Sequence, residues 1–329
     1  MQNQDNKYMA QALELARLGG RDVAPNPMVG AVIVKNGKVI GKGYHKKFGG
    51  PHAEVNAIRS VKNQDDLKGA TIYVTLEPCR HYGKTPPCSS LIQAVGISRV
   101  VCGSRDPFQI QMKVRSAQCA VRSEFVKGRI ADECVKLNKF FFTWVTKKRP
   151  FVTVKIAMSA DGFVAGVDGK PMRFTTAKQD REVHKIRAAH QAIMVGTNTV
   201  LNDDPQLNVR LVKGKDPLRV ILDPDMRIPK SARVFKDNNY LLAVTKQCAV
   251  RSAQCADRLN FIQNIWVSPT KKLISLKKLF RHLADIGISS ILAETGPTIY
   301  DSLKNEGLID ELIVYKSNKK IGNGLTVLI

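Results

Sequence analysis

Four residues able to bind a metal ion or carry a proton stand at the starts of two predicted helices, and their spacing constrains the first half of the chain more than any other feature. His52 and Glu54 lie at the start of a helix predicted over 52–61, and Cys79 and Cys88 flank the turn into a second predicted helix. One imidazole and two thiolates leave zinc an open fourth position for water. Glu54 lies beside such a metal, where its carboxylate can move a proton. The pattern predicts a hydrolytic zinc site with these three ligands and with Glu54 as the catalytic residue.

Two alternatives apply to the same residues. A histidine or a cysteine taken alone is more often a buried core residue than a ligand. A structural zinc site would have a fourth protein ligand in place of the open position and no need of a glutamate. All four residues together, at helix starts where main-chain N–H groups favour thiolate and carboxylate, fit neither alternative well. The order H-x-E followed by P-C is instead the arrangement of zinc nucleobase deaminases.

The chain around this site alternates between helical and extended patterns, which predicts layered α/β structure. Strands 29–34 and 39–44 are joined across Asn36-Gly37, the dipeptide most typical of a tight hairpin. The other elements predicted in the first half are helices at 8–18, 88–95 and 130–145 and strands at 71–76 and 99–102.

A chain of 329 residues is longer than one ordinary core, and a basic stretch at 146–149 ending in Pro150 marks the predicted boundary between two domains, 1–147 and 151–329. The second series of patterns is again α/β. It comprises strands at 152–156, 192–195, 219–222, 240–244, 290–293 and 311–315 and helices at 177–189, 275–285 and 297–305.

Charge and cysteine usage bear on partners and compartment. Fifty-two Lys and Arg against 28 Asp and Glu give a net charge of +24, a field that attracts polyanions. The lysines are scattered and no nucleic-acid motif accompanies them, so we expect no nucleic-acid partner. No apolar run approaches the ~18 residues of a membrane span. An odd count of seven cysteines argues against a disulfide framework and predicts a reducing, cytoplasmic location.

Eight residues separate Cys79 from Cys88, whereas deaminases of nucleosides and tRNA mostly have C-x-x-C. With this turn, the stretches 25–30, 52–54 and 75–88 closely resemble the bifunctional riboflavin biosynthesis deaminase–reductase family. The resemblance implies a cytidine-deaminase-like three-layer domain followed by a dihydrofolate-reductase-like domain. It also implies deamination of 2,5-diamino-6-ribosylamino-4(3H)-pyrimidinone 5′-phosphate, then NADPH-dependent reduction of the ribosyl group to ribityl. Zinc, NADPH, a phosphorylated pyrimidine substrate and a homo-oligomer are the expected partners.

The same resemblance assigns further site residues. Gly296 precedes a predicted helix, whose start lets main-chain N–H groups approach a phosphate, and two arginines can clamp a substrate phosphate. The resemblance places the cofactor around Ala157, Thr199, Asp203, Gly296, Pro297 and Thr298. It places the substrate around Asn26, Arg187, Leu207, Arg210 and Glu294.

Several departures from the family pattern leave alternatives open. From Phe108 onward the family's Asn and Gly-Lys-Gly stretch is missing, and the segment 114–120 recurs identically at 250–256, which predicts two inserted surface loops. Arg173 stands where the family often has an aromatic residue, and the family runs a few tens of residues beyond Ile329, so a truncated second domain with an incomplete sheet edge is expected. Two competing hypotheses remain. One is an active deaminase with a non-catalytic second domain, and the other is an RNA-binding nucleobase deaminase.

Overall fold

The chain divides into two compact units, Met1–Lys148 and Arg149–Ile329. A computed structural model describes residues 2–82, 86–111, 123–167, 172–250, 264–270 and 273–327. Within that part of the chain, no helix combines the length and the apolar character needed to cross a membrane. Each unit is built around its own sheet and is described separately.

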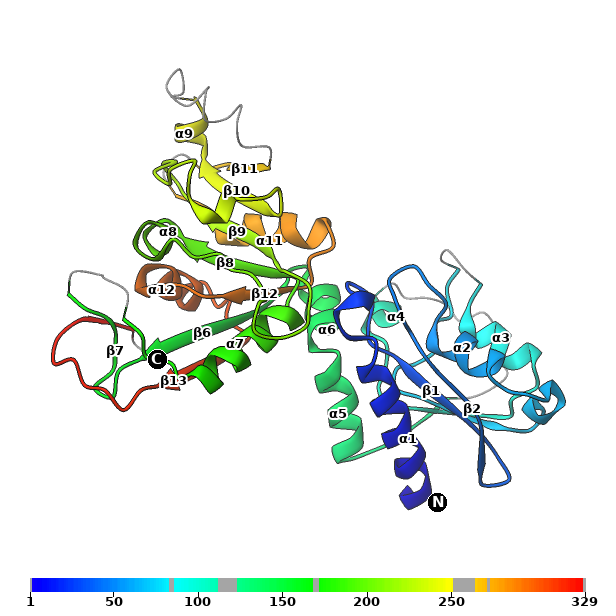
Figure 1. Ribbon diagram of the computed structural model, residues 1–329. Coiled ribbons are helices and arrows are strands. Elements are labelled where there is room, and N and C mark those ends of the chain that lie inside the picture. The colour runs from blue at the N-terminus through cyan, green and yellow to red at the C-terminus, as the bar shows by residue number, and fades with distance from the viewer. Residues whose placement is uncertain are drawn as a thin grey trace. The chain divides into compact units, whose positions relative to one another are not determined.

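The first unit contains a mixed five-stranded sheet in the order β2-β1-β3-β4-β5 (Figure 1). The first three strands in this order pair antiparallel, and β3, β4 and β5 pair parallel. Asn36 and Gly37 have positive φ angles of 50° and 73° and close the β1–β2 hairpin, as the dipeptide predicted. The strands are β1 (Gly30–Lys35), β2 (Lys38–Tyr44), β3 (Thr71–Val74), β4 (Arg99–Cys102) and β5 (Ser123–Phe125).

Helices cover both faces of this sheet, which gives the three predicted layers. Alternate residues of β1 point to opposite faces: Ile33 packs with Ala57 of α2 and Ile92 of α3, and Val32 packs with Leu13 of α1. In Figure 1, α1 and α5 run side by side on one face, and α2 and α3 lie on the other. The helices are α1 (Gln2–Arg17), α2 (Ala53–Arg59), α3 (Cys88–Ala94), α4 (Pro107–Gln111), α5 (Arg129–Leu137) and α6 (Lys139–Lys147).

The single helix predicted over 130–145 is wrong, because the chain breaks at Asn138 into α5 and α6. Asn138 leaves helical geometry with φ −103° and ψ 22°. Its buried side chain accepts a hydrogen bond from the Met28 N–H at 2.8 Å and donates one to the Met28 carbonyl at 2.9 Å. These contacts satisfy both main-chain groups of a residue distant in sequence, and that tertiary interaction overrides the local helical pattern.

An acidic residue near the start of α1 anchors that helix to the sheet. Asp5 accepts a hydrogen bond from Tyr73 of β3 at 2.7 Å and two from Arg99 of β4 at 2.9 and 3.0 Å. Arg99 also binds Glu124 of β5 at 2.7 Å, so one guanidinium joins the helix to the sheet edge. The hydrogen bond from Arg99 lowers the pKa of the Asp5 carboxyl below its ordinary value.

We expect Asp5→Asn to speed amide hydrogen exchange throughout α1 by about tenfold or more at pH 7, since a hydrogen bond to a charged group contributes roughly 1.5–3 kcal/mol. Because the folded pKa of Asp5 is depressed, this stabilisation is present above the ordinary pKa of about 4 and is lost as the pH falls through the folded pKa. Exchange measured by mass spectrometry should therefore differ between parent and variant at pH 7, and the difference should shrink as the pH falls below about 4. Glu14→Gln, which removes an exposed pair with Arg17, should leave α1 exchange nearly unchanged.

The second unit contains a seven-stranded sheet in the order β11-β10-β9-β8-β12-β6-β13, and every neighbouring pair is parallel. A small antiparallel pair, β7 with β14, accompanies it. All six strands predicted in this half are confirmed. The strands are β6 (Phe151–Met158), β7 (Phe163–Ala165), β8 (Ala192–Gly196), β9 (Leu218–Leu222), β10 (Tyr240–Thr245), β11 (Ile265–Ser268), β12 (Ser290–Ala293), β13 (Glu311–Lys316) and β14 (Leu325–Thr326).

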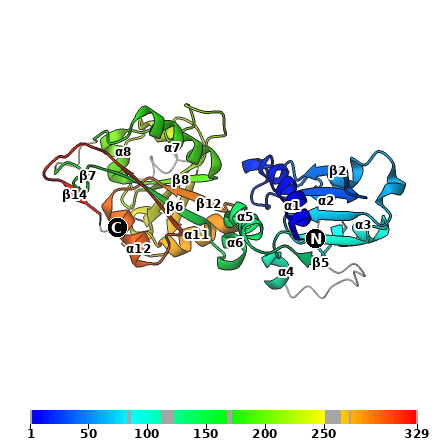
Figure 2. The same cartoon turned by 90° about the horizontal axis from the view of Figure 1, so that it is seen from below.

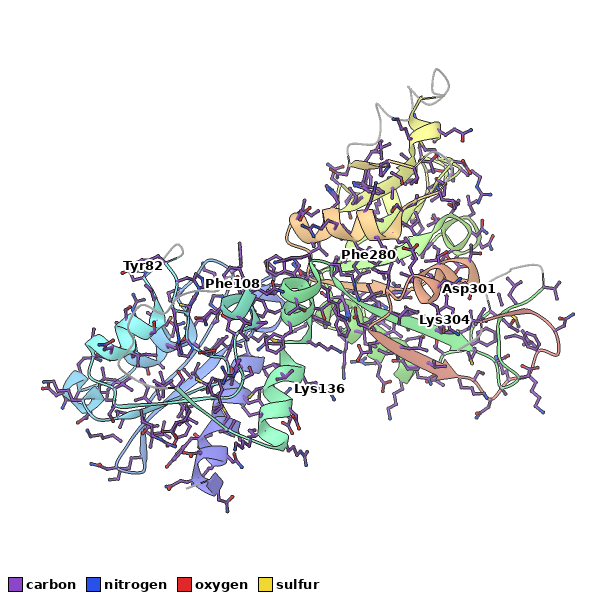
Figure 3. The ribbon with its side chains drawn as sticks, turned by 180° about the vertical axis from the view of Figure 1, so that it is seen from behind. Tyr82, Phe108, Lys136, Phe280, Asp301 and Lys304 are labelled. Atoms are coloured by element: carbon purple, nitrogen blue, oxygen red, sulfur yellow. The ribbon has the colours of Figure 1, made fainter. Side chains whose placement is uncertain are left out.

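Both faces of the parallel sheet are covered, as its near-continuous apolar strands require. Phe280 of α11, fully buried, packs with Val154 and Met194 on one face (Figure 3), and Val200 of α8 packs with Ile193 and Ile221 on the other. Figure 2 shows α11 and α12 below the sheet and α7 and α8 above it. The helices are α7 (Ala177–Ala189), α8 (Thr197–Asp203), α9 (Lys246–Val250), α11 (Leu276–Asp285) and α12 (Pro297–Asn305).

The repeated seven-residue segment lies outside the described residues in both copies, apart from Val250 at the end of α9. The expectation that the two copies form inserted surface loops stays a prediction. The expectation of an incomplete sheet edge also stays a prediction; β13 is the edge strand beside β6 in the described part of the sheet.

Candidate functional site

The three predicted metal ligands converge at one place in the first unit. His52 is the N-cap residue of α2, Cys88 is the first residue of α3, and Cys79 lies in the turn after β3. The Nδ1 atom of His52 lies 3.6 Å from the Cys79 Sγ and 3.3 Å from the Cys88 Sγ, and all three ligand atoms lie within 4.8 Å of one another. Two helix starts and one turn therefore bring together residues that are 36 positions apart in the chain.

These distances fit a zinc ion. With Zn–S near 2.3 Å and Zn–N near 2.0 Å, tetrahedral geometry separates neighbouring ligand atoms by roughly 3.5–3.8 Å. The side-chain hydrogen bond between the two cysteines lowers the pKa of the Cys79 thiol, which favours the thiolate that a metal binds. One imidazole and two sulfurs make three protein ligands among the described residues, the number that a catalytic zinc site uses.

Glu54 lies in the first turn of α2 and is 3% exposed. Burial, and next the negative charge of Cys79, raise the pKa of the Glu54 carboxyl to about 7. A carboxyl group poised near neutral pH can both accept and donate a proton. Glu54 therefore lies beside the metal-binding cluster with a carboxyl pKa near neutral pH.

Asn26 also lies close to this centre. Its Nδ2 is 3.3 Å from the Nε2 of His45, whose ring meets the His52 ring edge-on at 5.6 Å. The His45 Nδ1 lies 3.0 Å from the carbonyl of Pro51, which can only accept, so Nδ1 carries the proton and Nε2 accepts from Asn26. Burial lowers the pKa of His45, in agreement with this neutral form.

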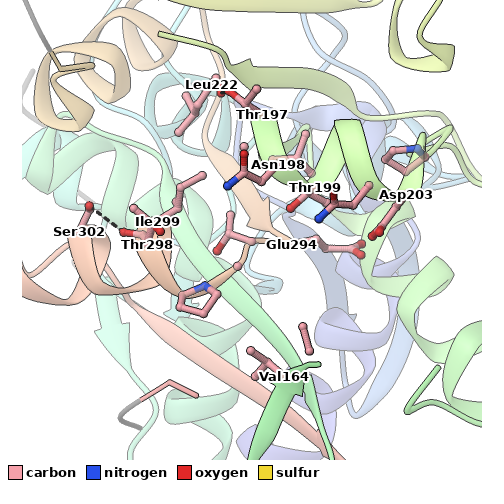
Figure 4. A pocket seen from close by; sticks show the side chains of 18 of the residues that line it. Val164, Thr197, Asn198, Thr199, Asp203, Leu222, Glu294, Thr298, Ile299 and Ser302 are labelled. Carbon is pink, nitrogen blue, oxygen red and sulfur yellow. Dashed lines mark hydrogen bonds between the residues drawn. The ribbon is translucent and has the colours of Figure 1, made fainter. Parts of the chain in front are cut away.

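A cleft of about 780 Å³ opens in the second unit, at the ends of β6, β8 and β12 (Figure 4). Its wall combines polar side chains from α8, such as Asn198 and Thr199, with the start of α12. Arg210 is not among the lining residues that the structure describes; it is exposed and donates to Asn208 at 3.0 Å. The cleft contains every other residue predicted for this half: Ala157, Arg187, Thr199, Asp203, Leu207, Glu294, Gly296, Pro297 and Thr298.

A buried carboxylate at the end of β12 holds two cations in this cleft. Glu294 accepts hydrogen bonds from Arg187 at 2.7 and 3.0 Å, and Lys155 of β6 lies 3.5 Å away. Burial opposes ionisation of Glu294, but Lys155 and Arg187 outweigh it and hold the pKa of the carboxyl at about 2. Nearby, burial raises the pKa of Asp203 despite the Lys155 charge. The wall of the cleft therefore carries three charged side chains, Glu294, Arg187 and Lys155. Beside them lies the Asp203 carboxyl, whose pKa is raised.

The start of α12 can accommodate a phosphate-bearing cofactor. A side chain added at Gly296 would meet nothing within 4 Å, so a ligand can approach the main chain there closely. The positive end of the helix dipole favours a phosphate at that place. Arg173, at the position where the family often has an aromatic residue, is 72% exposed and pairs with Asp180 at 2.7 Å. Its neighbours Met172 and Phe174 line the cleft instead.

The sequence prediction missed other residues in the wall. Lys155 is the single charge in the run Phe151–Met158, and a lone lysine in a buried strand is a signal that could have identified it. Arg227 lines the cleft and donates to Asn198 at 2.9 Å. No pattern in the sequence around Arg227 indicated this contact.

Comparison with known proteins identifies both units. Residues 2–104 match the cytidine and deoxycytidylate deaminase zinc-binding region, and residues 150–328 match the RibD C-terminal domain. The chain is 38% identical to the riboflavin biosynthesis protein RibD of Aquifex aeolicus, over 98% of this chain and 89% of that protein. It is 35% identical to RibD of Escherichia coli, over 97% and 89%.

Two solved structures match the fold of this chain over nearly its full length. A diaminohydroxyphosphoribosylaminopyrimidine deaminase/5-amino-6-(5-phosphoribosylamino)uracil reductase from Thermotoga maritima matches with a TM-score of 0.81 at 38% identity, covering 99% of this chain and 90% of that one. RibD of Acinetobacter baumannii matches with a TM-score of 0.85 at 32% identity and the same coverage.

The fold and the two sites thus define a bifunctional enzyme, a zinc-dependent deaminase joined to an NADPH-dependent reductase. The chain belongs to the RibD family of riboflavin biosynthesis proteins. The predicted fold class is confirmed, and neither competing hypothesis, the inactive second domain or the RNA-binding deaminase, finds support in these comparisons.

Proposed function

We propose that His52, Cys79 and Cys88 bind the zinc ion and that Glu54 carries the proton in the hydrolytic deamination of 2,5-diamino-6-ribosylamino-4(3H)-pyrimidinone 5′-phosphate. The observation that supports this most is the convergence of three ligand atoms within 4.8 Å beside a buried glutamate. The name of the Thermotoga maritima relative, a deaminase and reductase of this kind of substrate, supports the substrate class.

Each residue then has a distinct task. Zinc, when bound, supplies the acidity that makes a water molecule nucleophilic at neutral pH. Glu54 takes a proton from that water and returns it to the exocyclic amine, so that a C–O bond forms, the C–N bond breaks and ammonia leaves. Asn26, fixed by the neutral His45 ring, holds the substrate against the centre. Residues 1–147 constitute the deaminase domain in this proposal.

In the second domain, residues 151–329, NADPH binds along the wall formed by Ala157, Thr199, Asp203, Gly296, Pro297 and Thr298. NADPH, when bound, would supply a hydride to C1′ of the ribosyl group. The C1′–O4′ bond breaks and O4′ gains a proton, which gives the ribityl chain. Arg187 and Glu294 are bonded to each other, and they contact the substrate as this pair. Leu207 completes the substrate side of the cleft. Arg210, which is exposed and bonded to Asn208, is left out of these proposed contacts. We further propose that the enzyme is a cytoplasmic homo-oligomer that needs no nucleic acid.

A coupled assay on the diaminopyrimidine phosphate tests these assignments. The parent protein should hold one zinc per chain and release ammonia without NADPH; NADPH oxidation should follow only after deamination. Cys88→Ala should lose the metal and ammonia release, because two ligands hold zinc weakly. The control Cys134→Ala changes a buried cysteine outside the cluster and should keep both. A metal-free parent that still releases ammonia would contradict the zinc assignment.

A further inference from the structure

Gln109 of α4 contacts the main chain on both sides of Cys79. Its Oε1 accepts a hydrogen bond from the Arg80 N–H at 3.0 Å, and its Nε2 donates to the Pro78 carbonyl at 3.2 Å. These are the groups immediately after and before the residue that supplies one sulfur of the metal cluster. Gln109 is 8% exposed, so water competes little for these bonds.

The chemistry of the neighbours determines which way the amide points. An N–H can only donate and a carbonyl can only accept, so the oxygen must face Arg80 and the nitrogen must face Pro78. The second Nε2 hydrogen points to the Asp106 Oδ2, 3.1 Å away. Asp106 is itself buried and accepts from the Phe108 N–H at 2.9 Å, which orients the start of α4. The Gln109 amide is therefore fully hydrogen-bonded in one orientation only. Asp106, which is itself fixed by the Phe108 N–H, holds the amide in place.

The turn after β3 has other supports as well: the Cys88 N–H donates to the Cys79 Sγ at 3.3 Å, and Arg80 donates to the Glu77 carboxylate at 2.8 Å. The Glu77 N–H donates to the Ser104 carbonyl at 2.9 Å, and the Cys79 carbonyl accepts from the Ser89 N–H at 3.1 Å. Tyr82, further along the turn, is 78% exposed. Phe108 belongs to α4, the helix that contacts the turn (Figure 3). Among the described residues, Gln109 is the side chain that bridges the peptide groups on either side of Cys79.

We propose that Gln109 is a positioning residue for the metal centre, which holds the Cys79 sulfur at the distance and direction that zinc requires. This inference rests on the proposed assignment of Cys79 as a zinc ligand. Residues that orient metal ligands typically change metal affinity by about 10–100-fold when they are replaced.

Gln109→Met should release zinc to an excess of a chromogenic chelator about 10–100-fold faster than the parent full-length protein. Methionine keeps the length and volume of the side chain but removes both hydrogen bonds. With Co²⁺ in place of zinc, the thiolate-to-cobalt absorption should shift in position or intensity, because the Cys79 sulfur changes its angle to the metal. A role confined to folding stability would leave that spectrum unchanged.

Two further variants make the test decisive. Gln109→Glu keeps an acceptor for the Arg80 N–H and loses the donor to Pro78, so its zinc release should fall between parent and Gln109→Met; it serves as the readout if Gln109→Met does not fold. Gln64→Met removes two hydrogen bonds that the Gln64 Nε2 donates to main-chain carbonyls, at 2.7 and 3.3 Å, away from the cluster, and should match the parent. A parent without zinc overturns the proposed function itself. A zinc-bound parent whose release rate and cobalt spectrum equal those of both Gln109 variants overturns this inference alone.

Discussion

Replacing Glu54 with glutamine should lower the rate of ammonia release by about 10²–10⁴-fold, the usual contribution of a positioned proton carrier, while zinc content stays at the parent level. Glutamine keeps the shape of the buried side chain but cannot accept a proton from water or deliver one to the leaving amine. Glu54 is not one of the three clustered ligand atoms, so the metal should remain. Measurement of ammonia release together with zinc per chain checks both parts.

The second activity of the same protein provides the control. Reduction of substrate that has already been deaminated uses the cleft of the other unit, so the Glu54→Gln variant should oxidise NADPH on that substrate at the parent rate. Deamination close to the parent rate would remove Glu54 from the mechanism. Loss of zinc along with activity would instead show that the carboxylate helps to hold the metal.

Elements defined by local signals were predictable from the sequence. The helix predicted over 177–189 has the same bounds in the structure, because Thr176 and Gln179 form a reciprocal cap at its start. The helix predicted over 297–305 also has these bounds, with Pro297 in its first turn. Strand β4 matches its predicted range of 99–102. In each case the residues that begin or end the element are adjacent to it in the chain.

Elements that depend on distant partners were not predictable. The break at Asn138 exists because that side chain binds the main chain of Met28, and a helical pattern carries no trace of such a contact. Strand β5 has three residues and forms only by pairing with β4. Helix α8 follows directly on β8 and was also missed. Short elements bury too little to produce a periodic pattern.

The two sites differ in the same way. The zinc cluster was predictable because its chemistry appears as a motif over 37 consecutive positions, from His52 to Cys88. The role of Lys155 was not, since it depends on Glu294, 139 residues later in the chain. Gln109 is harder still, because an amide that supports a ligand has no characteristic spacing.

Removing the charge of Glu294 should have the largest effect in the second unit. Glu294→Gln leaves Arg187 and Lys155, whose side chains are 12% and 16% exposed, without their buried counter-charge. Breaking one partner of a buried ion pair typically costs about 3–5 kcal/mol. We therefore expect the second unit to unfold at a clearly lower urea concentration and NADPH oxidation to be lost, while ammonia release by the first unit continues.

The pH dependence of this effect follows from the sign of the pKa shift. The pKa of Glu294 is about 2 in the folded chain, below its ordinary value of about 4.3. The stabilisation is then complete above that ordinary value and is lost as the pH falls toward 2. The difference in urea midpoint between parent and Glu294→Gln should be constant from pH 6 to 8 and shrink below about pH 4.

A second substitution separates an unpaired charge from a general packing defect. Arg187→Met added to Glu294→Gln removes one of the two cations that lost their counter-charge and keeps its apolar volume, so the double variant should regain part of the lost stability. Asp301→Asn removes a charge from the exposed side of α12 (Figure 3) and should change the midpoint very little. If the double variant is less stable than Glu294→Gln by the full cost of Arg187→Met alone, the two residues are not coupled and the ion pair does not account for the effect. Partial recovery without any return of NADPH oxidation would show that the pair stabilises the cleft and is also needed, as a pair, for the reaction within it.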